Sequence, residues 1–453
     1  MGQEDKVTEN VKSTPDKYNI TYVIFFVAGV GCLLPWNFFC TAIPYFQYKL
    51  RNTSAKNSTI IAPDHMSHEQ VLFGNYLALC SMLPLAAFTI LNLFIMKWIS
   101  AFIRYVLGST IIFLMFVLTV ILIRIEMNAQ IFLGLTLASI VIINSAGAIV
   151  QGSLLGIASV LPSRNIRACL EGQALAGVLA ALAQIASLAG ASNFTTSAFA
   201  YFLIALAILG TSIIMTLMLK RNAHFKSYWD AETCIKVDDT KTQDGEENFL
   251  RLSELRSETV LEFDQHHVTQ RSSGHLLKSL YEMWIHGGCA MLTLMYTLML
   301  FPALLQPIKS VHFNPDNTWS SVFFVPVIVF LSFNVFDWIG RTLAGFVKWP
   351  RRNQRWILLA ICLARVVFVP LCMFMNQQPR KHLSVVFNHD AYPIILVILL
   401  GLTNGYFLSL AMTYGPSFAS PGNNEGAGVA LSIYMSLGLS FGVAVSAGLQ
   451  LAI

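Results

Sequence analysis

Long apolar stretches recur along this chain and constrain its fold more than any other feature. Polar breaks separate them, and an α-helix needs roughly 20 mainly apolar residues to cross the hydrocarbon core of a bilayer. Charged residues make up 12% of the chain, whereas a typical soluble domain carries about 25%. The sequence therefore predicts an all-α polytopic membrane protein embedded in a lipid bilayer.

Length and hydropathy predict eleven transmembrane helices in a 6+5 arrangement. We expect residues 1–18 to form a cytoplasmic tail, 19–219 a six-helix half and 278–453 a five-helix half. The polar segment between the halves, 220–277, is rich in charged residues, Ser and Thr, which predicts a cytoplasmic, largely disordered loop. The predicted spans are residues 19–47, 70–96, 103–124, 129–160, 169–191, 196–219, 278–305, 319–347, 356–376, 391–415 and 426–452.

The Lys and Arg residues predict the orientation, because cytoplasmic loops carry an excess of both. Twenty of them, with Arg104 counted as a loop residue, fall on the side of the N-terminus and seven on the other. We therefore expect the N-terminus inside the cell and, after an odd number of spans, the C-terminus outside. The glycosylation sequons at Asn52 and Asn57 would then lie in the first outer loop. The short N-terminal tail holds no dileucine address, so we expect the plasma membrane.

Several function classes are disfavoured by what the sequence lacks. It contains no P-loop and no HExxH motif, so we expect neither an enzyme nor an ATP-driven pump. The eight cysteines form no CxxC or Cys/His cluster, and we expect no metal or other cofactor. The net charge of +5 is spread over loops, which does not suggest nucleic acid as a partner.

Three polar residues share one face of the predicted eighth span. Asp337 and Arg341 are four residues apart, one helical turn, and Asn334 precedes Asp337 by three. Ionisable groups are costly inside hydrocarbon, so we expect them to have a function. A charged pair beside an amide can bind a polyhydroxylated solute through charge-assisted hydrogen bonds. An internal salt bridge that locks helices together fits these residues as well.

Other polar and aromatic residues in the spans also allow two interpretations. Gln151 can donate and accept hydrogen bonds, which suits a nucleobase edge, but it can equally bond to a neighbouring helix. Trp36 can stack on a planar ligand or anchor its helix at the interface, and Pro35 should kink or open that helix. Arg365, in the ninth span, needs a carbonyl or acidic partner, and we expect a structural or gating role for it.

Small residues recur in the fifth and last spans. Gly172 and Gly177 lie in the fifth, and Gly438 and Gly442 follow each other at a spacing of four in the last. Small residues let helices approach closely. We therefore expect these glycines to serve helix packing or gating rather than ligand contact.

Together, these motifs resemble the equilibrative nucleoside transporter family over nearly all of the membrane portion. The sequence is most similar to the broad-specificity plasma-membrane branch, types one and two. The resemblance is carried by Leu34-Pro-Trp-Asn-Phe-Phe39 with Thr41-Ala42, Met82-Leu-Pro-Leu85, Gly147-Ala-Ile-Val-Gln-Gly-Ser-Leu154, Gly172-Gln173 with Leu175-Ala-Gly177, Phe333-Asn-Val-Phe-Asp-Trp-Ile-Gly-Arg341, Leu363-Ala-Arg-Val-Val-Phe-Val-Pro370 and Asn404-Gly-Tyr406.

The resemblance implies a major-facilitator-like arrangement that moves nucleosides by alternating access, without ion or ATP coupling. It implies that Arg341, oriented by Asp337, holds the ribose hydroxyls and that Gln151 contacts the base. Gly147 matches a position linked in the family to sensitivity to nucleoside-analogue inhibitors. The resemblance places in the central site Trp36, Cys40, Met82, Leu85, Gln151, Phe301, Asn334, Asp337, Arg341 and Leu439.

The sequence departs from the family pattern at a few positions. Cys40 stands where Met or Ile is usual, Ala174 replaces a Gly, and Glu171 puts an acid at the cytoplasmic entry of the fifth span. One alternative is therefore a transporter of the same fold that carries organic cations or is influenced by protons, for which Glu171 is the nearby acidic candidate. A third is a non-transporting receptor or scaffold, which would not need the polar face of the eighth span.

Overall fold

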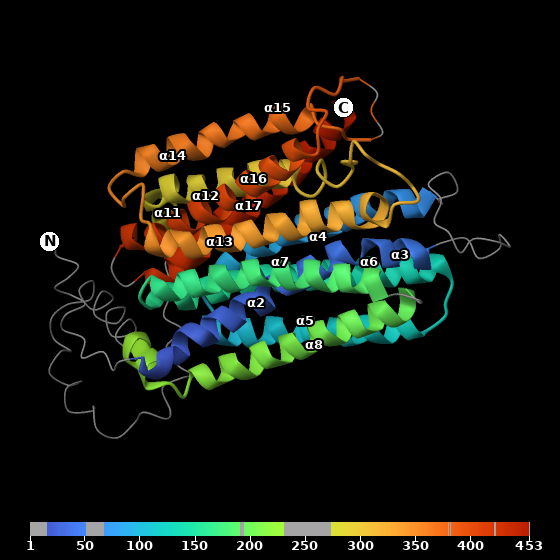
Figure 1. The fold of residues 1–453 in the computed structure, drawn as a ribbon. Coiled ribbons are helices and arrows are strands. Elements are labelled where there is room, and N and C mark those ends of the chain that lie inside the picture. Colours follow the sequence, from blue (N-terminus) through green and yellow to red (C-terminus); the bar gives the residue numbers. More distant parts are fainter. Residues whose placement is uncertain are drawn as a thin grey trace, which may run out of the picture.

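The protein is a bundle of long helices in the computed structural model, which describes residues 16–50, 68–190, 194–230, 273–378, 380, 382–420 and 423–452. Within this described part, ten helices are long and apolar enough to cross a membrane. A further apolar helix, α12 (Trp284–Leu300), is shorter. The helices run side by side along the bundle (Figure 1). The predicted all-α polytopic fold class is confirmed, and the predicted count of eleven spans is compatible with these helices.

Each of the six spans predicted before the polar loop corresponds to a long helix. These helices are α2 (Ile20–Thr41), α4 (His68–Ile95), α5 (Ala101–Arg124), α6 (Ala129–Val160), α7 (Arg164–Gly190) and α8 (Phe194–Leu219).

The five spans predicted after the loop are more often interrupted. The helices are α11 (Ser273–Glu282), α12, α13 (Ser332–Phe346), α14 (Arg355–Ala364), α15 (Phe368–Met373), α16 (Ala391–Tyr414) and α17 (Asn424–Ala452). Two π-helical segments, Trp319–Phe323 and Val325–Leu331, lead into α13. A 3₁₀ turn, Arg365–Val367, separates α14 from α15. Pro370 follows it and has no N–H to donate to the carbonyl of Val366, which would continue a regular α-helix.

The helix of the first predicted span, 19–47, is interrupted, but not at Pro35, where the sequence predicts a kink or opening. α2 continues as one helix through Pro35, so the opening predicted there is not seen. The helix ends at Thr41 instead, and a short helix, α3 (Ile43–Lys49), begins with Pro44 in its first turn. Proline has no N–H to continue a preceding helix but is tolerated in the first turn of a new one.

Some expectations fall on parts of the chain that the structure does not describe. Most of the predicted loop 220–277, namely 231–272, lies outside the described residues, as do the sequons at Asn52 and Asn57.

α2 begins at the left end of the bundle in Figure 1 and α17 ends toward the right. The first long helix therefore begins at one end of the bundle, and the last helix finishes toward the other end.

Of the glycines singled out in the sequence, Gly172, Gly438 and Gly442 lie against the backbone of another helix, and Gly177 lies against the side chain of Asn334. A Cβ at Gly172 of α7 would lie 2.0 Å from the carbonyl oxygen of Phe26 in α2, and one at Gly29 would lie 2.1 Å from that of Cys169. α17 approaches α12 in the same way, with Gly438 against Met291. At these distances there is no room for a Cβ atom, so the close crossing of α2 and α7 requires glycine at both positions.

Replacing Gly172 by alanine should destabilise the bundle. The added methyl group would overlap backbone atoms of α2, and relieving such overpacking typically costs about 1–3 kcal/mol. We expect the Gly172→Ala variant to unfold at a clearly lower temperature than the wild type in detergent. Gly134→Ala is the matched control, because a Cβ at Gly134 meets nothing within 4 Å. Equal unfolding temperatures for the two variants would contradict the close contact.

Candidate functional site

A cavity lies between the two halves of the bundle. Its lining comes from α2, α4, α5, α6 and α7 on one side and mainly from α12, α13, α16 and α17 on the other. Its empty space, part of it open to solvent, is about 1210 Å³. The residues placed in the site at the sequence level all line it, namely Trp36, Cys40, Met82, Leu85, Gln151, Phe301, Asn334, Asp337, Arg341 and Leu439, and Gly147 joins them.

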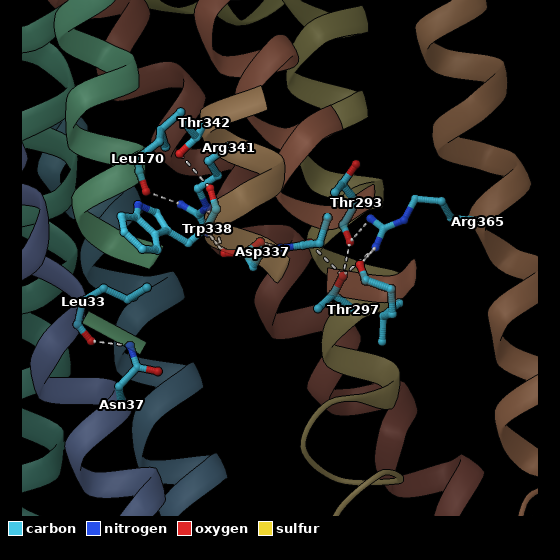
Figure 2. Close-up of polar contacts among 12 residues, drawn as sticks. Leu33, Asn37, Leu170, Thr293, Thr297, Asp337, Trp338, Arg341, Thr342 and Arg365 are labelled. Carbon is cyan, nitrogen blue, oxygen red and sulfur yellow. Dashed lines mark hydrogen bonds and ion pairs between the residues drawn. The ribbon is translucent and has the colours of Figure 1, made fainter. Parts of the chain in front are cut away.

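The most polar part of the lining is an ion pair on α13. Arg341 donates from Nε and Nη2 to Oδ2 of Asp337, over 2.9 and 2.8 Å, as residues four apart on a helix can. Both side chains are buried. Arg341 Nη1 also donates to the backbone carbonyl of Leu170 in α7, 2.8 Å away (Figure 2). The pair therefore lines the cavity and joins the halves, so the two interpretations of it are compatible.

Arg341 keeps donor capacity after making these contacts. A guanidinium carries five N–H groups, and three are used toward Asp337 and Leu170. Two remain, one on each terminal nitrogen of a side chain that lines the cavity. They can donate charge-assisted hydrogen bonds to the oxygen atoms of a ligand.

Amide side chains supply polar groups on other walls. Asn37, Asn144 and Asn334 each donate from Nδ2 to the carbonyl four residues earlier, over 2.8 to 3.0 Å. The Oδ1 atoms of Asn37 and Asn144 are the groups left to accept from a ligand, whereas that of Asn334 packs against Gly177 of α7. Gln151, on α6, makes a weak contact of 3.6 Å from Nε2 to the sulfur of Met435. A ligand with donors and acceptors at its edge can replace that weak partner with a stronger one.

Apolar and aromatic side chains form the rest of the lining. Phe301 stacks on Phe333, with ring centroids 4.2 Å apart and planes 15° from parallel. Met82, Leu85 and Leu439 line the cavity without offering hydrogen bonds. Flat apolar surfaces beside a few fixed polar groups suit a ligand that has a planar ring and a hydroxylated part.

Some residues that line the cavity were not among the site residues predicted from the sequence. Thr297 of α12 and Asn404 of α16 line the cavity, and Asn404 Nδ2 donates to Oδ1 of Asp337 over 2.6 Å. Gln173 of α7 also lines it, and its Nε2 has no partner among the described residues. Asn404 and Gln173 belong to the family motifs, and this membership could have indicated that they lie in the site. Thr297 had none, because threonine is common in membrane helices and its direction depends on packing.

Arg104 does not lie in a loop, although the sequence predicts one there. It was counted as a loop residue but lies inside α5, where it is buried. Its Nη2 pairs with Oε1 of Glu425 in α17 at 3.0 Å, and its Nη1 donates to Oδ1 of Asn92 over 2.5 Å. Hydropathy could not pair two residues so far apart in the chain. This buried pair closes the end of the bundle at which α5 and α17 begin, here named the Arg104 end.

Glu171 lies near the same end, outside the cavity lining. It accepts a hydrogen bond from the hydroxyl of Tyr22 and lies 3.5 Å from Nε of Arg167. Arg167 in turn donates to the backbone carbonyl of Gly345 in α13 over 3.5 Å. Glu171 is therefore engaged by donors on its own side of the bundle and presents no free carboxylate to the cavity.

Two patterns typical of enzymes are a nucleophile elbow and a cluster of metal-ligating side chains. Gly438-Leu-Ser-Phe-Gly442 has the spacing of a hydrolase nucleophile elbow, but it lies within helix α17 instead of at a strand-to-helix turn. No cluster of three or more metal-ligating side chains occurs in the part of the chain that the structure describes.

Comparison with known proteins decides the family. Residues 137–451 match the family model described as nucleoside transporter. Human equilibrative nucleoside transporter 1 is 35% identical, over 95% of this chain and 97% of the relative. Human equilibrative nucleoside transporter 2 is 34% identical over the same shares. The chain belongs to the equilibrative nucleoside transporter family. It is a membrane transporter and not an enzyme.

Three further likenesses concern one more relative and two solved structures. Rat equilibrative nucleoside transporter 3 is 32% identical, over 96% of this chain and 90% of the relative. Among solved structures, the major facilitator transporter FucP in its outward conformation matches with a TM-score of 0.53 at 11% identity, over 95% of this chain and 96% of that one. The proton:xylose symporter XylE matches with a TM-score of 0.55 at 13% identity, over 96% and 89%. The transporter therefore has a major-facilitator-like fold.

Gly147 offers a test of where ligands lie in the cavity. A Cβ at this position meets nothing within 4 Å, and the residue lines the cavity. We expect Gly147→Val to fold normally and to weaken a bulky nucleoside-analogue inhibitor by at least about tenfold, a loss of about 1.4 kcal/mol. Competition against uridine uptake would measure this. Gly134→Val, at an open position outside the lining, is the control and should leave inhibition unchanged. Inhibition that is unchanged in Gly147→Val would place the inhibitor elsewhere.

Proposed function

We propose that this transporter moves purine and pyrimidine nucleosides across the membrane in both directions, driven by their own gradients. Family membership supports this proposal, since the similar proteins are equilibrative nucleoside transporters. The one structural observation on which the proposed binding site depends is the Asp337–Arg341 pair in the cavity between the halves.

The cavity suits both parts of a nucleoside. The two remaining N–H groups of Arg341 would donate to the ribose hydroxyls, while Asp337 keeps the guanidinium in place. Gln151 would bond to the polar edge of the base, and the stacked rings of Phe301 and Phe333 would provide an apolar surface nearby. Trp36 lies in the lining and would contribute a further aromatic surface.

The charges around the site disfavour the organic-cation alternative. Asp337 receives donors at both carboxylate oxygens, from Arg341 and Asn404, so its negative charge is already compensated. Glu171, the other acid considered for cation binding, is held by Tyr22 and Arg167 outside the lining. A cationic solute would meet the guanidinium of Arg341 without a free carboxylate to offset it.

Alternating access would proceed by breaking and remaking contacts between the halves. At the Arg104 end, the Arg104–Glu425 pair and the bond from Arg341 to Leu170 hold α5 and α7 against α17 and α13. Opening this end requires both contacts to separate. Arg341 takes part in one of them and lines the cavity, so a bound ligand can influence the closure of this end.

Uptake of labelled uridine and adenosine in transport-deficient cells tests the proposal. We expect saturable uptake by the wild type without a pH or ion gradient. Arg341→Lys should lower uridine uptake efficiency by about tenfold or more, because an ammonium group cannot satisfy Asp337, Leu170 and the ribose together. Arg355→Ala, an exposed position at the start of α14, is the control. The proposal fails if wild-type uptake does not exceed background in cells that display the protein at the surface.

We also propose a plasma-membrane location with the N-terminus inside the cell. The Lys and Arg distribution supports this orientation, even with Arg104 removed from the loop count, which changes twenty to nineteen against seven. Glycosylation at Asn52 or Asn57 would require the loop between α3 and α4 to be outside.

A deglycosylation experiment tests the orientation. Treating the surface-labelled protein with a glycosidase should increase its gel mobility, and the Asn52→Gln/Asn57→Gln variant should show no shift. An epitope tag at the C-terminus should be accessible to antibody on intact cells. A tag that becomes accessible after permeabilisation alone would contradict the predicted orientation.

A further inference from the structure

Arg365 is a buried cation that lies outside the cavity lining. Its Nη1 donates to the backbone carbonyl of Thr293 over 3.0 Å, and its Nη2 donates to Oγ1 of Thr297 over 3.0 Å (Figure 2). Nη2 also reaches the carbonyl of Leu400 at 3.3 Å. Among the residues that the structure describes, no carboxylate pairs directly with this guanidinium. A buried cation held by neutral oxygens is costly and calls for a reason.

A chain of hydrogen bonds leads from Arg365 to the site. Thr297 Oγ1 donates to Oδ1 of Asn404 over 2.7 Å, and Asn404 Nδ2 donates to Oδ1 of Asp337 over 2.6 Å. The other carboxylate oxygen of Asp337 accepts from Arg341. All five side chains are buried. The chain therefore links the ninth span to the ion pair through α12 and α16.

The chemistry of the donors gives this chain a direction. A threonine hydroxyl has one proton, and that of Thr297 can reach either the carbonyl of Thr293 at 2.9 Å or Oδ1 of Asn404. Arg365 donates both to that carbonyl and to Oγ1 of Thr297. Its presence therefore favours the hydroxyl proton pointing toward Asn404.

The direction of the hydroxyl sets the orientation of the next two groups. When Oδ1 of Asn404 accepts from Thr297, its Nδ2 is the atom that faces Asp337. The Asp337 carboxylate then has a donor at each oxygen and is held on two sides. Without Arg365, the Thr297 hydroxyl can turn back to its own helix, as threonine hydroxyls commonly do. Asp337 would then lose the support that keeps Arg341 oriented.

We propose that Arg365 is a positioning residue for substrate recognition. It acts through Thr297 and Asn404 to hold the Asp337 carboxylate, and so directs the remaining N–H groups of Arg341 toward the ribose hydroxyls. This inference rests on the proposed contact between Arg341 and the ribose. It assigns recognition of hydroxyl groups to a residue that does not touch the substrate.

The test compares two inhibitors of labelled uridine uptake, unlabelled uridine and 2′,3′-dideoxyuridine, which lacks both hydroxyls. The quantity measured is the ratio of their inhibition constants. Arg365→Lys and Thr297→Val should each reduce the preference for uridine by about tenfold, with little change for the dideoxy compound. A role in folding alone would change the amount of protein at the surface and leave the ratio unaltered.

Thr293→Val is the matched control, one helical turn from Thr297. It makes the same substitution but keeps the backbone carbonyl that accepts from Arg365, and it loses a hydroxyl that contacts the sulfur of Cys362 at 3.5 Å. The preference for uridine should be retained. The Arg365→Lys/Thr297→Val double variant should lose no more preference than either single variant, because both changes break one chain. If Arg365→Lys does not reach the surface, Arg365→Gln, which keeps an N–H donor, takes its place beside Thr297→Val and the control.

The outcomes separate this inference from the proposed ribose contact. If Arg341→Lys keeps the wild-type preference, the ribose contact is wrong and the inference falls with it. If Arg341→Lys loses the preference while Thr297→Val keeps it, the role of Arg365 alone is overturned. Equal losses for both inhibitors in the Arg365 and Thr297 variants, or the same loss in Thr293→Val, would also overturn it.

Discussion

The ion pair between Asp337 and Arg341 is the interaction on which the rest of the site depends. Two buried charges are costly in a membrane unless each is paired and hydrogen-bonded. Here the carboxylate has donors at both oxygens, and the guanidinium reaches across to the carbonyl of Leu170. The pair thus satisfies its own charges, connects the two halves and still leaves two N–H groups on Arg341 for a ligand.

Close helix packing supplies the other partners of that pair. α16 lies directly against α13, since a Cβ at Gly405 would be 2.0 Å from the backbone oxygen of Asp337. This approach brings Asn404, the neighbouring residue, within hydrogen-bond distance of the carboxylate. The glycines of α2 and α7 do the same in the other half, where α7 carries the carbonyl that accepts from Arg341. Small residues therefore determine which polar groups can meet.

The distribution of charge explains why a neutral, hydroxylated solute fits this transporter. Arg341 and Arg365 place two cations near one carboxylate, that of Asp337. Arg365 itself donates to neutral oxygen atoms. Hydroxyl and carbonyl acceptors on a ligand complement such a site, whereas a cationic ligand would not. A separate buried pair, Arg104 with Glu425, closes one end of the bundle without occupying the cavity. The proposed recognition uses the Asp337–Arg341 pair, whereas the Arg104 end is held by the Arg104–Glu425 pair together with the bond from Arg341 to Leu170.

The sequence by itself determined the helical membrane fold and the polar face of α13. Apolar length identifies spans, and α13 is amphipathic, so the spacing of Asn334, Asp337 and Arg341 showed that they share a face. α7 and α16 are nearly uniform around their axes, so their sequences do not reveal which side meets a neighbour. Tertiary structure alone brought Asn404 to Asp337, Thr297 to Arg365 and Arg104 to Glu425. Helical periodicity orders residues within one helix, whereas the register and rotation between helices follow from packing.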